Sequence, residues 1–273
     1  MELTDWLVLL MIIIYSTTFS YYTIMRHYSF RSNAWDLGIL VQSIATTTKG
    51  KLFVNNVELY YSSSGSYFGV HFTPILFLLI PFFYIIPKVE TILIIQSIIL
   101  ALGAIPVYLI SKKTLKYNLI SLFITASYLL NPSLQGINWY DFHTQAFFPL
   151  FILLATYYLK ERKLSLYSLF ILISLTTIEQ SSYFLMIYII YCMWELRKEL
   201  KKSYVERKIN KHALFPLLTL TIIGLWLALT YYIKQTINPS PPPEIKAAKG
   251  FKFLDVNDPF EIPLKIVTNP TLI

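Results

Sequence analysis

The sequence predicts an all-α membrane protein: a polytopic bundle of about seven transmembrane helices with a long external first loop that carries helices on the membrane surface. Of its 273 residues, 55% are hydrophobic and only 14% are charged, and the mean hydropathy is +0.55. Uncharged runs such as residues 6–25 and 214–233 have about the 20 residues that a helix needs to cross the hydrocarbon core. This composition excludes a water-soluble enzyme and a disordered tail.

The first apolar run is interpreted as a transmembrane helix because it lacks the basic start and the small-residue cleavage site of a secretory signal. The single cysteine, Cys192, lies in another apolar run, so neither an intramolecular disulfide nor a cysteine metal motif is available. We expect residues 1–233 to form the transmembrane domain. After the first run, its apolar segments are 89–111, 117–135, 145–159, 164–179, 182–194 and 214–233.

Basic residues predict the orientation. The formal net charge is +8, but the 23 Lys and Arg residues gather between the apolar runs, which is typical of topology signals and speaks against nucleic-acid binding. Short basic loops stay in the cytoplasm, so we expect a multi-pass protein of the cell membrane with a cytoplasmic N-terminus, an external loop over 26–88 and an external tail. The basic connections are Lys112, Lys113 and Lys116; Lys160, Arg162 and Lys163; and seven residues between Arg197 and Lys211.

The apolar run 72–86 does not fit this alternation. It is short and is interrupted or followed by Pro74, Pro81 and Pro87, each of which removes a backbone donor and disturbs a helix. We interpret it as an interfacial or re-entrant segment whose backbone is satisfied by neighbouring protein. The alternative, a short eighth span, would place a basic loop outside.

The external loop and the tail have distinct patterns. Apolar residues at helical spacing predict a helix on the membrane surface over Asn33–Thr48, with Asn33 as its cap, and Ser62–Ser66 is interpreted as a flexible connector. Residues 234–273 are expected to form an external tail, rich in proline from Asn238 to Pro243. This tail looks unfinished, as in a truncated chain.

Five ionisable residues on the predicted external side are candidates for chemistry. A carboxylate can deprotonate a hydroxyl or hold a cation, and a carboxylate with an imidazole two residues away can relay a proton or bind a metal. In an extended segment such a pair shares one face. The five residues are Asp36, His71, Asp141, His143 and Glu179.

Each candidate also has a structural alternative. Asp36 would favour the dipole of the surface helix, His71 would anchor the chain at the membrane boundary, and Glu179 would be a solvated turn residue. Asp141 and His143 would cap the helix that begins near Thr144.

Four blocks give the chain a family resemblance: Trp35–Gln42, Gly69–Leu76, Pro106 near a helix end, and Asp141–His143. Over about residues 1–195 it resembles a family of prokaryotic predicted membrane proteins, found in archaea and bacteria, of the domain-of-unknown-function type. Members show an Asp-Leu-Gly…Gln block, a His-Phe-x-Pro block and an Asp-Phe-His block.

The chain departs from this pattern at several positions. Val41 and Ile44 replace commoner polar and aromatic residues, and Ile178–Gln180 stands where a Lys-Glu-Asp block is expected. Members of the family usually continue with more membrane helices. The resemblance therefore implies a C-terminally short or split protein, with a partner subunit that supplies the missing helices.

The family is in turn loosely similar to the C-type polytopic glycosyltransferases, which use a polyprenyl-phosphate-linked sugar on the external membrane face. This resemblance implies that Asp36 is the catalytic base or a metal ligand, with membrane lipid and the lipid-linked sugar as partners. A divalent cation, Mg or Mn, would be held among Asp36, His71, Asp141 and His143. The implied substrate-binding residues are His71, Asp141, His143, Glu179 and Gln42.

Two further functions stay open. A non-catalytic membrane subunit or remnant fits the short C-terminus and Gln180. A lipid or solute transporter fits the polytopic fold, although the sequence shows no convincing internal repeat and no charged residue near the middle of a long span.

Overall fold

The computed structural model describes residues 2–60, 62–207, 211–239 and 268, and it confirms the all-α fold. Outside helices, this part of the chain contains one antiparallel bridge, between Val54 and Ser66, and no strand. Most of the predicted tail, 234–273, lies outside the described residues. Its first residues are helical, since the last long helix ends at Ile237 rather than at the expected residue 233.

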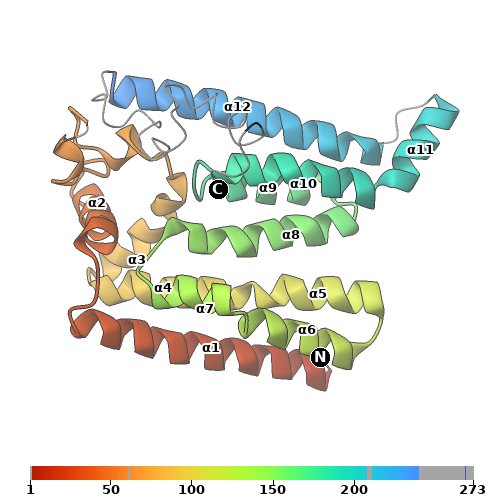
Figure 1. The fold of residues 1–273 in the computed structure, drawn as a ribbon, viewed down its shortest axis with the longest axis horizontal. Helices are drawn as coiled ribbons and strands as arrows, with labels where there is room; N and C mark the ends of the chain where they lie inside the picture. The colour runs from red at the N-terminus through yellow and green to blue at the C-terminus, as the bar shows by residue number, and fades with distance from the viewer. Residues whose placement is uncertain (1, 61, 208–210, 240–267, 269–273) are drawn as a thin grey trace.

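Long helices run side by side and form the bundle in Figure 1. In the described part of the chain, three helical segments are long and apolar enough to cross a membrane, namely Leu3–Tyr28, Val89–Leu115 and Leu214–Ile237. Shorter helices pack between them, with α8 against α9 and α10 against α12. The bundle helices are α1 (Leu3–Tyr28), α4 (Val89–Leu102), α5 (Ala104–Leu115), α6 (Asn118–Leu129), α7 (Pro132–Trp139), α8 (Phe148–Lys160), α9 (Leu164–Leu175), α10 (Ser181–Glu195) and α12 (Leu214–Ile237).

Two expected spans end earlier than the apolar pattern indicates. The run 117–135 breaks into α6 and α7, because Asn131 accepts a hydrogen bond from the backbone N–H of Ser133 at 2.8 Å and Pro132 starts the new helix. The run 164–179 ends as a helix at Leu175. The hydroxyls of Thr176 and Thr177 donate to the preceding carbonyls there, which competes with a further helical turn.

The basic connections gather at one end of the bundle, the end that also holds the N-terminus of α1 (Figure 1). This arrangement agrees with the predicted alternation of the spans, while which end faces the cytoplasm stays a prediction from charge. Ion pairs join the connections to one another, to the N-cap of α1, to the end of α10 and to α11 (Arg197–Glu206). They are Lys112–Glu2 (3.3 Å), Lys113–Glu161 (2.5 Å), Lys160–Glu195 (2.9 Å) and Arg162–Glu199 (2.6 Å).

The segment 72–86 lies at the opposite end, beside α2 (Figure 1). It forms a 3-10 helix, η4 (Pro74–Leu79), followed by α3 (Ile80–Ile85). Together these are about 21 Å long, which is too short for a hydrocarbon core of about 30 Å. The N–H of Ile75 donates to the carbonyl of Thr176 at 3.1 Å, so neighbouring protein satisfies one backbone group of this segment. Its interfacial or re-entrant placement stays a prediction.

The helix expected over Asn33–Thr48 is present, and Asn33 caps it by accepting from the N–H of Trp35 at 2.9 Å. Its first turn is π-helical, η1 (Ala34–Gly38), and it continues as α2 (Ile39–Thr47). The apolar face of α2 is buried against protein, whereas the sequence pattern predicts a helix lying on the membrane surface. The prediction of a flexible connector at Ser62–Ser66 is wrong, because Ser62 and Ser66 are buried and hydrogen-bonded.

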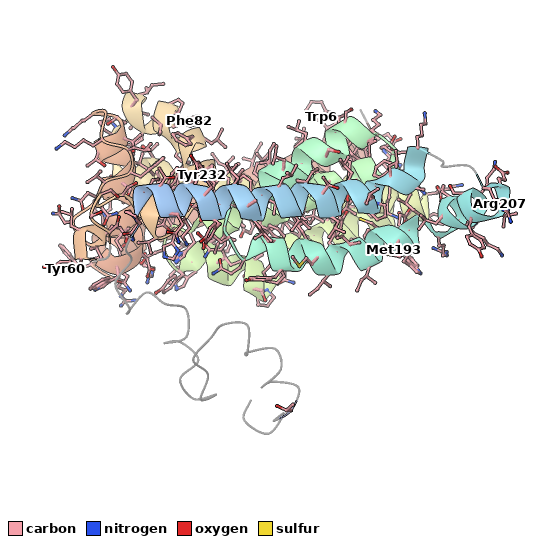
Figure 2. All side chains as sticks on the ribbon, turned by 90° about the horizontal axis from the view of Figure 1, so that it is seen from above. Trp6, Tyr60, Phe82, Met193, Arg207 and Tyr232 are labelled. Carbon is pink, nitrogen blue, oxygen red and sulfur yellow. The ribbon has the colours of Figure 1, made fainter. Side chains whose placement is uncertain are left out.

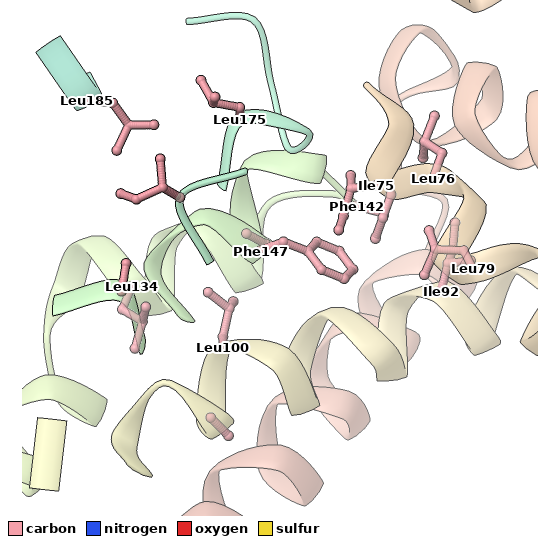
Figure 3. Close-up of a cluster of buried hydrophobic side chains, with 14 of the residues drawn as sticks. Ile75, Leu76, Leu79, Ile92, Leu100, Leu134, Phe142, Phe147, Leu175 and Leu185 are labelled. Carbon is pink, nitrogen blue, oxygen red and sulfur yellow. The ribbon is translucent and has the colours of Figure 1, made fainter. Parts of the chain in front are cut away.

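A buried apolar core supports the end of the bundle that carries η1 and α2. Figure 3 shows Phe142 and Phe147 among Leu100, Ile75 and Leu76, and both phenylalanine rings are fully buried. Such close-packed cores resist deformation, so the segments above them are held firmly. The outside of the bundle is also apolar: Figure 2 shows Trp6, Phe82, Met193 and Tyr232 around it, and all four are exposed, as expected for helices in contact with lipid.

Candidate functional site

A cavity of about 270 Å³ lies at the end of the bundle opposite the basic connections. Four separate segments form its wall, so the folded chain brings together residues that are far apart in the sequence. Four of the five predicted ionisable candidates line it: Asp36, His71, His143 and Glu179. The rest of the wall is formed by Trp35, Ile39, Leu40, Glu58, Tyr67, Thr73, Thr144, Gln145, Ile178 and Gln180.

Asp36 and His143 contact one another in the wall of this cavity, with 3.6 Å between Asp36 Oδ1 and His143 Nε2. The other carboxylate oxygen, Oδ2, accepts a hydrogen bond from the Tyr140 hydroxyl at 3.2 Å. His143 Nδ1 lies 3.1 Å from the backbone carbonyl of Asp141. A carbonyl only accepts, so Nδ1 carries a proton and Nε2 is the nitrogen that can exchange a proton with Asp36 or a ligand.

Gln96 of α4 fixes the position of His143. Its side-chain oxygen accepts from the backbone N–H of His143 at 2.7 Å, and its amide nitrogen donates to the carbonyl of Asp141 at 3.1 Å. Gln96 is fully buried. The imidazole is therefore anchored to a long bundle helix rather than carried by a free loop.

Asp141 lies outside the cavity wall. It is 1% exposed, its Oδ1 pairs with Arg26 at 2.6 Å and its Oδ2 accepts from the N–H of Asn33 at 2.7 Å. The Arg26 guanidinium on α1 thus engages the carboxylate, and the expected pairing of Asp141 with His143 on one face stays a prediction. Gln42 also lies outside the wall, where its side-chain oxygen accepts from the N–H of Asn56 at 3.1 Å.

Glu179 and His71 form another part of the wall. Glu179 Oε1 accepts from Lys234 Nζ at 2.9 Å and from the N–H of Phe72 at 2.8 Å. Burial lowers the pKa of His71, the Lys234 charge lowers it further, and the Glu179 carboxylate acts in the opposite direction. Sequence reasoning missed Lys234, because the apolar run of α12 stops at Ile233, one residue before it.

Glu58 is a cavity residue that no motif indicated. It is 4% exposed, and burial raises its pKa to about 7. The nearby Tyr67 also has a raised pKa, first because of burial and then because of the Glu58, Glu179 and Asp36 carboxylates. One sequence signal was available: between Lys51 and Lys88, Glu58 is the only Asp, Glu, Lys or Arg.

The expected metal ligands are not gathered into one cluster. In the residues that the structure describes, no group of three or more His, Cys, Asp and Glu side chains could hold a metal ion. Asp36 and His143 are the two candidates that lie together, and Asp141 is engaged by Arg26. A cation at this site would therefore need further ligands from a substrate.

The fold and this site define a polytopic α-helical membrane protein with a polar, carboxylate-lined cavity at one end of its bundle. The chain belongs to the family described as predicted membrane protein (DUF2079), whose model matches residues 26–273. This confirms the family resemblance and extends it beyond residue 195. No curated protein and no solved structure matches the chain, so the comparisons give no support to a similarity with glycosyltransferases.

Proposed function

We propose that this protein is an integral membrane glycosyltransferase-like enzyme that uses a polyprenyl-phosphate-linked sugar at the external membrane face. The observation that carries the proposal is the Asp36–His143 pair, 3.6 Å apart in the wall of a polar cavity. A carboxylate and an imidazole in contact form an acid–base unit that can accept a proton from a hydroxyl and hold it while a bond is transferred.

In the proposed reaction the oxygen of an acceptor hydroxyl attacks the anomeric carbon of the sugar, and Asp36 accepts the proton of that hydroxyl. The bond between that carbon and the phosphate oxygen breaks, and its electron pair leaves with the polyprenyl phosphate. His143, whose Nδ1 proton is fixed by the Asp141 carbonyl, shares the transferred proton through Nε2. Tyr140 keeps the carboxylate oriented through its hydrogen bond to Oδ2.

The position of the cavity supports a lipid-linked donor. It lies at the end of helices whose outer faces are apolar, so a bundle that spans the bilayer would present it to the lipid head groups. Lys234, which pairs with Glu179, lies near this end of α12 and is 31% exposed, so its ammonium group could also bind a lipid phosphate. A Mg²⁺ or Mn²⁺ ion bound by Asp36 would complete its shell with phosphate oxygens, as Mg²⁺ often does.

Native mass spectrometry of the gently solubilised protein tests the proposal. We expect a co-purifying polyprenyl phosphate, and transfer of the sugar from the loaded lipid to an acceptor. Asp36→Asn should slow this transfer by about 10²- to 10⁴-fold, the usual contribution of a general base. His71→Ala should weaken retention of the lipid.

Asp5→Asn is the matched control, because it makes the same chemical change at the opposite end of the bundle, where Asp5 accepts from Tyr108 at 2.9 Å. It should retain lipid and transfer at wild-type levels. Bulk phospholipid alone, in wild type and variants alike, would overturn the proposal and favour a non-catalytic subunit or a transporter.

A further inference from the structure

Glu58 differs from the Asp36, Asp141 and Glu179 carboxylates because no ion pair joins it to another residue that the structure describes. Glu179 pairs with Lys234, Asp141 with Arg26, and Asp36 contacts His143 and Tyr140. Glu58 Oε2 is buried and has no hydrogen-bond partner in the described part of the chain. A buried polar atom without a partner is costly, and a ligand bound in the cavity would satisfy it.

Glu58 is held firmly in place. Its backbone N–H donates to the side-chain oxygen of Asn55 at 2.9 Å, and the amide of Asn55 donates to the Ser43 hydroxyl on α2 at 3.0 Å. The same helix begins at the π-helical turn that carries Asp36. Glu58 and Asp36 are therefore attached to one rigid element and face one cavity.

The surroundings of Glu58 favour its protonated form. The titratable groups that line the cavity with it are Asp36, Tyr67, His71, His143 and Glu179, and the Lys234 cation beyond them is paired with Glu179. Burial raises the pKa of Glu58 to about 7. Glu58 is therefore a carboxyl group of this cavity that can donate a hydrogen bond to a ligand.

We propose that Glu58 binds the sugar of the lipid-linked donor, its protonated carboxyl group donating a hydrogen bond to a hydroxyl or ring oxygen. The indole of Trp35, which lines the same cavity and is 62% exposed, packs against the apolar face of the sugar ring. This inference rests on the proposed function, because it assigns the part of the same cavity that recognises the donor's sugar. A polyhydroxylated ligand also fits the remaining wall, which offers the hydroxyls of Thr73 and Thr144 and the amides of Gln145 and Gln180.

The test compares two probes by native mass spectrometry of the full chain: polyprenyl phosphate carrying one hexose, and the same lipid without sugar. Glu58→Ala should reduce retention of the sugar-loaded lipid by about tenfold, the value of one neutral hydrogen bond, and leave retention of the unloaded lipid unchanged. Glu58→Gln should retain the sugar-loaded lipid, because an amide also donates. Glu90→Gln is the control: Glu90 accepts from the Tyr28 hydroxyl and does not line the cavity.

Infrared spectroscopy supplies a second measurement that does not depend on turnover. The wild type should show the carbonyl stretch of a protonated carboxyl group that disappears in Glu58→Gln, fades as the pH rises through about 7 and shifts when the sugar-loaded lipid binds. Retention of both lipids by Glu58→Ala at wild-type levels would overturn the inference and leave the proposed function standing. Retention of neither lipid by the wild type would instead overturn the proposed function, and the inference with it.

Discussion

Arg26 and Asp141 form a buried ion pair, with 2.6 Å between Arg26 Nη1 and Asp141 Oδ1. The pair joins the end of α1 to the segment that carries Tyr140 and His143. Asp141 also accepts from the N–H of Asn33, the cap of the turn that presents Asp36. One carboxylate thus connects both halves of the Asp36–His143 pair, and we assign it to positioning rather than to substrate contact.

Replacing one member of this pair should destabilise the protein strongly. Arg26→Met leaves the Asp141 carboxylate buried without its cation, which costs about 3–5 kcal/mol. A clear fall in the unfolding temperature of the purified Arg26→Met variant would show this loss of stability. Arg31→Met, at an exposed position in the same segment, should change this temperature little, and Arg26→Met combined with Asp141→Asn should be more stable than Arg26→Met alone. Equal unfolding temperatures for the Arg26 and Arg31 variants would contradict the structural role.

Sequence reasoning could predict the parts of the fold that depend on periodicity and charge. The apolar runs located the bundle helices, the basic connections gathered at one end, and Asn33 capped its helix. Local polar chemistry decided what the pattern could not show: Asn131 and Pro132 split one expected span, and threonine hydroxyls ended another.

The candidate site was predicted in part for a similar reason. Asp36, His71, His143 and Glu179 stood out because charges are rare between apolar runs. Glu58 and Lys234 carried no motif, and their roles depend on which segments pack together. The Arg26 partner of Asp141 could not be predicted, because spacing within a segment says nothing about a cation on another helix.

Glu58 should make stability fall as the pH rises. Its pKa in the folded protein is about 7, against an ordinary value of 4.5, so the folded state holds a proton that the unfolded state has lost. The stabilisation from this proton is complete below about pH 4.5 and is lost as the pH passes through 7, with a total approaching about 3 kcal/mol. Unfolding temperatures measured from pH 5 to pH 8 should therefore decline less in Glu58→Gln than in wild type. Parallel pH profiles of the unfolding temperature in Glu58→Gln and wild type would show that burial does not raise the pKa of Glu58.

Lys234 and Glu179 should shift the pKa of His71 in opposite directions. A nearby cation disfavours the imidazolium and a nearby carboxylate favours it, so Lys234→Met should raise the pKa of His71 and Glu179→Gln should lower it. The measurement is a pH titration of ¹³C-labelled histidine by nuclear magnetic resonance, with His71→Ala to assign the signal among the four histidines. Lys49→Met, at an exposed position between α2 and the His71 segment, should leave the signal where it is. If the pKa of His71 shifts in the same direction in the Lys234 and Glu179 variants, these two charges do not determine it.

The two ends of the bundle should lie on opposite sides of the membrane, with the cavity outside. The native Cys192 is fully buried and therefore gives little background with a membrane-impermeant thiol reagent. Ser63→Cys introduces an exposed thiol at the cavity end, and Lys163→Cys introduces one among the basic connections. Because short basic loops are retained in the cytoplasm, intact cells should label the cysteine at residue 63, and the cysteine at residue 163 should react only after the membrane is opened. The reverse pattern would place the Asp36–His143 pair in the cytoplasm, where a donor presented on the external face could not reach it.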